Sequence, residues 1–429
     1  MNYNNSNKMK SNYKPIGDYI RLVDERNKGL KVETLVGLSI SKQFIKSVAN
    51  TIGTDMENYK IIRKNQFACS TMQVRRDKKM PLALYTDFEP AIISQAYPVF
   101  EIIDEDILTP EYLMMWFTRS EFDREACFHA VGGVRGSLEW EDFCGMKLPV
   151  PSIEKQREIV NEYNVIQKRI ELNNQLIQKL EDTAQTIYKQ WFVEFEFPNE
   201  DGKPYKSNSG KMVWCEELEK EIPEGWSVVD LESIIDHKKG LPFKSKDYNT
   251  VGIPIVRVSD LTKTSINFKS CFCLNEKHIK NYTSIYLEPN DIIITSVGSW
   301  ATNPDSVVGK VVKVPNVKFN SLLNQNMVRL RSKLNESQLI LFTALSNKDF
   351  SEYTISGAQG SANQASVTLK HLFEYKLCFP KSNQIKLMCI VFKLIYGLAN
   401  IKENEVNNLK EFKDLILSKM TKIENEITA

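Results

Sequence analysis

At 429 residues the chain is too long for one ordinary hydrophobic core, so we expect two or three domains. Its hydrophobic share of 42% and its charged share of 26% are typical of folded proteins and exclude wholesale disorder. A net charge of +2 is low for a protein that would wrap nucleic acid unaided, because phosphate affinity grows with the number of cations presented.

Neither a membrane span nor a secretory signal is expected. The longest apolar runs are only a few residues, and the first 13 residues are polar and rich in asparagine. Among the eight scattered cysteines, the close pair Cys271 and Cys273 has no second pair that could complete a zinc site. We therefore expect a cytoplasmic protein with reduced thiols, no membrane association, no metal and no cofactor.

Short β-rich runs alternate with Gly, Asn and Pro turns in both halves of the chain. Clear examples are residues 97–103, 253–258, 291–297 and 307–314. Each half is therefore predicted to form an α+β globule that is built mainly around strands.

Two segments, residues 122–151 and 350–380, share an order of features. Each has a helical lead, a Gly-x-x-Gly turn followed by serine, and a Lys-Leu-x-x-Pro strand. The copies are offset by 224 residues at the turn and by 229 at the strand. This spacing indicates an internal repeat whose second copy carries a short insertion.

After each Lys-Leu-x-x-Pro strand the apolar residues recur in steps of four and three, which is typical of a coiled-coil seam. A helix over residues 153–195 would be about 65 Å long, the length of a spacer. The polar Asn173 among the aliphatic residues of this seam would fix register at a cost in stability. The main seam positions are Ile166, Ile170, Asn173, Ile177 and Leu180 in the first helix and Ile395, Ala399, Val406, Leu409 and Ile416 in the second.

The alternative is that both helices pack flat on the globules as ordinary amphipathic helices. Their length and the unbroken 3.5-residue period favour the coiled coil.

Residues 189–235 lead from a helix exit at Trp191 and Phe192 through a turn-rich crossing to the sequence Pro-Glu-Gly-Trp at 223–226. This stretch closely resembles the central region shared by specificity subunits of Type I restriction-modification enzymes. Further matches lie at residues 252–258, 298–299, 324–326 and 360–372. The resemblance covers nearly the whole chain from Tyr59 onward, whereas residues 14–54 match weakly.

The resemblance implies an α+β fold of two tandem α/β target-recognition domains, held apart by two long antiparallel coiled-coil helices with pseudo-two-fold symmetry. Each domain would read one half of a bipartite site in double-stranded DNA. The two domains differ strongly in sequence, which predicts two different half-sites. The expected division is a disordered tail (1–13), a first recognition domain (14–152), a central spacer helix (153–195), a crossing segment (196–222), a second recognition domain (223–382) and a C-terminal spacer helix (383–429).

The same resemblance implies partners that carry the chemistry. Two modification (methyltransferase) subunits would dock on the helices and the crossing segment, and restriction (motor-nuclease) subunits would join the full complex. The exposed charged faces of the helices fit this role, although a merely solvated face has the same sequence pattern.

A catalytic centre is not expected in this chain. The sequence has no Asn/Asp-Pro-Pro-aromatic loop with a glycine-rich cofactor turn, no phosphate-binding loop of a motor, and no carboxylate cluster of a nuclease. These absences exclude a fused restriction-modification enzyme unless the sequence is a fragment of a longer protein. A non-catalytic coiled-coil adaptor whose globules bind protein partners is the remaining alternative, and its gene need not lie beside methyltransferase and nuclease genes.

Sequence is read in the major groove, where Arg recognises guanine and Asn or Gln recognises adenine. The candidate DNA-binding residues of the first domain are Thr71, Gln73, Arg75, Arg76, Arg135 and Ser137. Those of the second domain are Lys244, Lys246, Ser296, Ser299, Trp300, Asn303, Gln359, Ser361, Asn363 and Gln364. A turn-stabilising or phosphate-holding role is the alternative for each, and Trp300 could belong to the core.

Overall fold

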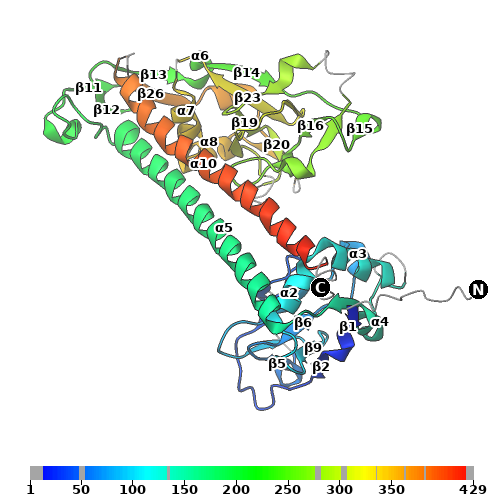
Figure 1. Cartoon of the computed structure of the whole chain (residues 1–429). Helices are drawn as coiled ribbons and strands as arrows, with labels where there is room; N and C mark the ends of the chain where they lie inside the picture. Colours follow the sequence, from blue (N-terminus) through cyan, green and yellow to red (C-terminus); the bar gives the residue numbers. More distant parts are fainter. Residues whose placement is uncertain are drawn as a thin grey trace, which may run out of the picture. The chain divides into compact units, whose positions relative to one another are not determined.

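The computed structural model describes residues 13–47, 54–132, 136–275, 282–300, 307–334, 336–361, 364–380 and 383–421. The chain divides into two compact units, Met1–Leu172 with Val406–Ala429 and Asn173–Glu405. Each unit combines one β-rich globule with parts of two long helices, α5 (Ile153–Tyr188) and α10 (Asn383–Lys419) (Figure 1). The predicted fold class is therefore confirmed.

Unit 1 is built around a four-stranded antiparallel sheet with the strand order β2-β9-β6-β7. The strand pairs β1–β10, β3–β4 and β5–β8 complete its β structure. The bounds are β1 Tyr13–Pro15, β2 Ile20–Val23, β3 Val36–Leu38, β4 Phe44–Lys46, β5 Lys60–Ile62, β6 Phe67–Cys69, α1 Val74–Asp77, β7 Leu82–Leu84, β8 Ala91–Ile93, β9 Val99–Ile102, α2 Pro110–Thr118, α3 Ser120–His129, α4 Trp140–Gly145 and β10 Lys147–Pro149.

Unit 2 contains an antiparallel sheet of order β14-β23-β19-β21, a five-stranded sheet β15-β17-β16-β22-β18 and a three-stranded sheet β20-β25-β24. The pairs β11–β12 and β13–β26 flank them. The bounds are β11 Met212–Cys215, β12 Lys220–Pro223, β13 Trp226–Asp230, α6 Leu231–Ile234, β14 Ile235–Lys239, β15 Tyr248–Asn249, β16 Ile253–Val256, β17 Phe272–Leu274, β18 Tyr286–Leu287, β19 Ile292–Thr295, β20 Val297–Gly298, β21 Val311–Lys313, β22 Ser321–Leu323, β23 Met327–Ser332, α7 Gln338–Leu345, α8 Lys348–Ser356, β24 Gln359–Ser361, β25 Gln364–Ser366, α9 Leu369–Phe373 and β26 Lys376–Pro380.

The internal repeat extends to the topology of the two main sheets. In unit 1 Phe67 of β6 pairs with Leu84 and Phe100, its neighbours on either side. In unit 2 Ile292 of β19 pairs in the same way with Lys313 and Leu330. The central strands β6 and β19 are therefore equivalent, and the chain leaves each of them into the segment that carries candidate DNA-reading residues.

The two long helices pack against each other within each unit. In unit 1 the Lys413 ammonium group donates to Gln167 Oε1 at 2.9 Å. In unit 2 Trp191, just after α5, packs against Phe392. Glu181 of α5 and Glu403 of α10 both face Lys313. The contacts thus move back along α5 as they move forward along α10, so the helices are antiparallel there. All ten seam positions are buried or half-buried.

Aromatic side chains anchor the start of the crossing segment in the core of unit 2. The Phe197 ring stacks between Tyr205 at 4.6 Å and Trp226 at 5.1 Å. Phe192 packs on the same Trp226. None of the helices in the described parts of the chain has the length and apolar character needed to cross a membrane.

Candidate nucleic-acid interface

In unit 1, the loop after β6 presents the predicted arginines at the surface. A backbone hydrogen bond of 2.8 Å from Ser70 N to Pro81 O closes its base. The loop contains the single helical turn α1, flanked by Gln73 (φ 65°) and Lys78 (φ 52°) in the left-handed conformation. Arg75 and Arg76, on α1, are exposed. We define residues 71–80 as the first reading loop.

A second segment, the turn between α3 and α4, lies against this loop. Val131 and Ser137, on either side of residues 133–135, which lie outside the described part, exchange two backbone hydrogen bonds of 2.9 Å. Leu138 N then donates to Thr71 O at 2.9 Å, and the Arg75 Nη1 donates to Gly132 O at 3.1 Å. The structure thus brings together Thr71, Arg75 and Ser137, which are distant in sequence. Arg135 lies outside the described residues.

Glycine at position 136 is required by this close approach. Its φ is +25°, and a Cβ atom there would lie 2.7 Å from the Arg75 Cβ. Even alanine would therefore force the turn away from the loop. The structure therefore uses this glycine for contact within the protein.

The two exposed arginines, Arg75 and Arg76, differ in the partners that they bind within the protein. Arg76 forms an ion pair with its neighbour Asp77 at 2.7 Å, and the hydrogen bond from Arg76 lowers the pKa of the Asp77 carboxyl. Arg75 donates through one nitrogen to a backbone carbonyl. Because a guanidinium group has five N–H donors, Arg75 keeps donors for a base edge while the turn orients it.

In unit 2 the equivalent surface is made by the segment after β19 and the β24–β25 hairpin. β20 pairs with β25, and the Trp300 Nε1 donates to Ser361 O at 2.7 Å. Gln359, Ser361 and Gln364 are exposed on this hairpin. Asn303 and Asn363 lie outside the described residues.

The same backbone hydrogen bond joins the two segments in both units. Val367 N donates to Ser296 O at 3.0 Å, as Leu138 N donates to Thr71 O. In both units the acceptor comes soon after the central strand, and the donor precedes the short helix α4 or α9. The two candidate surfaces therefore share one backbone design and carry different side chains.

Some predicted residues of unit 2 lie away from this exposed surface. Ser296 is only 4% exposed, so its side chain is not available to a base, and its carbonyl oxygen has the supporting role described above. Trp300 is half-buried and packs on the core of unit 2. The Ser299 carbonyl oxygen accepts from Val308 N at 2.9 Å. Lys244 and Lys246 are exposed in the connection from β14 to the five-stranded sheet.

Three exposed apolar residues in and beside the first reading loop were not among the sequence candidates. They are Met72, Phe128 and Val131, and Phe128 is 81% exposed. A helical wheel over α3 could have identified Phe128, because Phe122 and Ala126 define the buried face of that helix. Apolar side chains can contact thymine methyl groups in the major groove.

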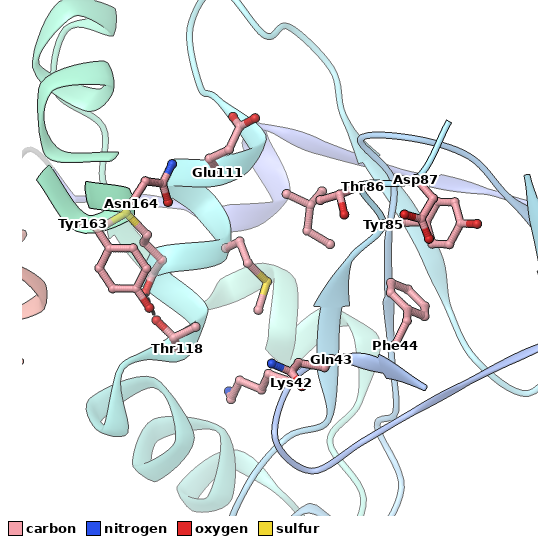
Figure 2. A pocket seen from close by; sticks show the side chains of 13 residues that line it. Lys42, Gln43, Phe44, Tyr85, Thr86, Asp87, Glu111, Thr118, Tyr163 and Asn164 are labelled. Atoms are coloured by element: carbon pink, nitrogen blue, oxygen red, sulfur yellow. Dashed lines mark hydrogen bonds between the residues drawn. The ribbon is translucent and has the colours of Figure 1, made fainter. Parts of the chain in front are cut away.

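The described residues hold no cluster of three His, Cys, Asp or Glu side chains that could bind a metal ion. The histidines that can be assigned have packing roles. His371 stacks on Tyr353 and its Nε2 lies 2.9 Å from Tyr353 O, while the His237 ring packs on Phe373. A cavity of about 460 Å³ in unit 1 is lined by Lys42, Thr118, Tyr163 and other residues (Figure 2).

Comparison with known proteins identifies the family. The family described as "Type I restriction modification DNA specificity domain" matches residues 39–182 and 223–411. The MjaIX specificity subunit of Methanocaldococcus jannaschii is 28% identical over 249 residues, which are 57% of this chain and 53% of that protein. The MjaVIII specificity subunit of the same organism is 22% identical over 280 residues, 64% of this chain and 61% of that protein. The chain thus spans between half and two thirds of the length of these relatives.

A solved structure supports the same fold. The S subunit of a Type-I restriction-modification system from M. genitalium superimposes with a TM-score of 0.50, at 15% identity and over 95% of both chains. The family match over most of the chain confirms the resemblance found in its sequence. The protein belongs to the family of Type I restriction-modification DNA specificity proteins.

Proposed function

We propose that this chain is the specificity subunit of a Type I restriction-modification complex in the cytoplasm. Each globule reads one half of a bipartite double-stranded DNA site. The chain carries no catalysis of its own and directs methylation and cleavage by its partner subunits.

The observation that carries this proposal is the pair of equivalent surfaces. Each is formed after the central strand of a repeated sheet and is joined by the same backbone hydrogen bond, Leu138 N to Thr71 O or Val367 N to Ser296 O. The exposed side chains differ: Arg75 and Arg76 on one surface, Gln359 and Gln364 on the other. Arginine favours guanine and glutamine favours adenine, so two unlike half-sites are expected.

The long helices offer a docking surface for the modification subunits. One face of α10 exposes apolar residues at helical spacing, namely Leu387, Ile390, Leu394, Leu398 and Ile401. In unit 1 an apolar groove of about 790 Å³ lies between Val165 and Ile166 of α5 and Phe412 and Leu415 of α10. Exposed apolar surface of this kind is typical of protein interfaces. We propose that two methyltransferase subunits bind the helix pair, and that restriction subunits join that assembly.

Replacing Arg75 or Arg76 by alanine tests the reading assignment. We expect a relaxed first half-site, with about 1 to 3 kcal/mol less discrimination, and an unchanged second half-site. Arg21→Ala, which removes an exposed arginine on β2, is the matched control and should change neither. Methylome sequencing of cells that carry each variant gives the result. Loss spread equally over both half-sites would contradict the domain-by-domain assignment.

The partner assignment has its own test. Mass measurement of the purified assembly should give one copy of this chain with two methyltransferase copies, and Leu394→Glu should weaken the assembly. A stable lone monomer that binds its DNA site tightly would contradict it. Globules that bind proteins but no DNA would indicate the adaptor function instead.

A further inference from the structure

A buried ion pair lies behind the first reading loop. The Lys42 ammonium group donates to Asp123 Oδ1 at 2.7 Å and to Phe117 O, at the end of α2, at 2.6 Å. It also lies 4.8 Å from the centre of the Phe122 ring. The two side chains are only 7% and 10% exposed, so this pair is withdrawn from solvent.

The pair reaches the reading loop through one carboxylate oxygen. Asp123 Oδ1 accepts, besides the lysine, the backbone N–H of Met80 at 3.1 Å. Met80 is the last residue of the reading loop, and its side chain is fully buried. Because α1 within the loop is bounded by left-handed Gln73 and Lys78, its conformation depends on anchors at its ends.

The same aspartate is linked to the other half of the surface. Asp123 belongs to α3, whose C-terminal end leads into the turn closed by Val131 and Ser137. That turn accepts the Arg75 side chain through Gly132 O. We infer that Lys42 and Asp123 are positioning residues that hold the first reading loop and its facing turn in one arrangement, and so determine how sharply the first half-site is read. This inference rests on the proposed function of that surface.

The hairpin that carries Lys42 also packs on unit 1 through Phe44, whose ring contacts Tyr85 at 5.3 Å. Its tip and the side chains Thr118 of α2 and Tyr163 of α5 line the cavity of about 460 Å³ (Figure 2). Beside this cavity the two hydrogen bonds of Lys42 tie the tip of the hairpin to α2 and α3. Lys42 itself has a φ of 61° in the turn between β3 and β4, a left-handed conformation that is uncommon for residues other than glycine.

In unit 2 the corresponding end of the loop after the central strand is held by packing of uncharged groups. By the register of the central sheets, Gly309 corresponds to Met80, since each lies four residues before an equivalent strand residue, Lys313 or Leu84. Gly309 packs on Thr354 of α8, where a Cβ on the glycine would overlap the threonine side chain. The ion pair is therefore a feature of the first surface. Buried ion pairs are weak contributors to stability and can be retained because they specify one arrangement.

Two double variants in the full complex test the inference. Lys42→Met with Asp123→Leu removes both charges together, which spares the fold an unpaired buried charge, and also removes the acceptor for Met80 N. Lys42→Met with Asp123→Asn removes the same charges but keeps an oxygen acceptor. The measurement compares two equilibrium affinities and gives their ratio. One is the affinity for a duplex with the bipartite sequence that this complex methylates, and the other is the affinity for a duplex with one base changed in either half-site.

For the leucine double variant we expect about a tenfold loss of discrimination at the first half-site, the size of one lost base contact, with the second half-site unchanged. The asparagine double variant should lose less, because Met80 keeps its partner. Wild-type ratios in the leucine double variant, or equal weakening at both half-sites, would overturn the inference. If Arg75→Ala also leaves both ratios unchanged, the assignment of the reading loop itself fails, which is a distinct outcome.

Discussion

The indole nitrogen of Trp300 donates a hydrogen bond of 2.7 Å to the backbone carbonyl oxygen of Ser361. In unit 1 the Arg75 side chain donates in the same way to Gly132 O at 3.1 Å. In both units, therefore, a side chain from the loop after the central strand binds a backbone carbonyl of the facing glycine-containing segment. The donor is a tryptophan where the hairpin packs on the core and an arginine where the turn is exposed.

Trp300→Phe removes this donor and keeps an aromatic ring on the core of unit 2. A hydrogen bond of this kind contributes about 0.5 to 1.5 kcal/mol, so we expect a few-fold loss of discrimination at the second half-site only. Binding to duplexes with single base changes measures it. Trp214→Phe, at an exposed tryptophan on β11, is the control. Unchanged discrimination would mean that the hairpin keeps its position without the indole.

Gly136→Ala should disturb the first surface through the turn that faces the first reading loop. The new Cβ would lie 2.7 Å from the Arg75 Cβ, on a backbone with a φ of +25°. Overpacking of this kind costs about 1 to 3 kcal/mol, and here it would push the turn off the reading loop. We expect a lower midpoint of thermal unfolding and a relaxed first half-site. Gly145→Ala is the matched control, since a Cβ there meets nothing within 4 Å. A wild-type methylation pattern in the Gly136 variant would contradict this role of the turn.

The sequence predicted the repeat because its signals are local. The Lys-Leu-x-x-Pro segments form β10 and β26, and the coiled-coil period marks α5 and α10. The sheet orders were beyond sequence reasoning, because β2 pairs with β9 across a long stretch of chain. For the same reason the Lys42 and Asp123 partnership leaves no local pattern.

Side-chain exposure could not be predicted from the sequence either. Ser296 follows a β-rich run as a reading residue would, but the hairpin that covers it is formed by a segment about seventy residues later, and no local pattern shows that burial. The apolar face of α10 through Leu394 shares its helix with the buried seam, so the sequence favoured charged docking faces where the structure exposes apolar ones.

A buried charge cluster in unit 2 predicts a pH-dependent stability. Lys313 Nζ donates to Asn400 Oδ1 at 2.9 Å, and the carboxylates of Glu181 and Glu403 both face this lysine. Thr264 and Lys263 face Glu181 as well. Burial raises the pKa of Glu403 more than nearby Lys313 lowers it.

Because folding raises this pKa above its ordinary value of 4.5, the folded state holds the proton more tightly. The contribution of Glu403 to stability is therefore fully present below pH 4.5 and is lost as pH rises through the folded pKa. Glu403→Gln should stabilise the protein at pH 8, and the gain should shrink as pH falls toward 4.5. Urea unfolding at several pH values measures it. Glu411→Gln, exposed on the same helix, is the control. A gain that does not change with pH would exclude titration of Glu403 as its cause.

The last prediction concerns Asn173 in the helix seam. Its side chain is only 3% exposed, and its Nδ2 finds no hydrogen-bond partner among the described residues. An unsatisfied buried amide costs about 1 to 3 kcal/mol, so Asn173→Leu should raise the urea midpoint of unfolding. Asn174→Leu, exposed one residue later on the same helix, should leave it unchanged. A polar seam residue can also specify register, and a shifted register would alter the spacing between the half-sites. We therefore expect the Asn173 variant to be more stable and to methylate sites of more than one gap length. A more stable variant that methylates sites of a single, unchanged gap length would show that other contacts set the register.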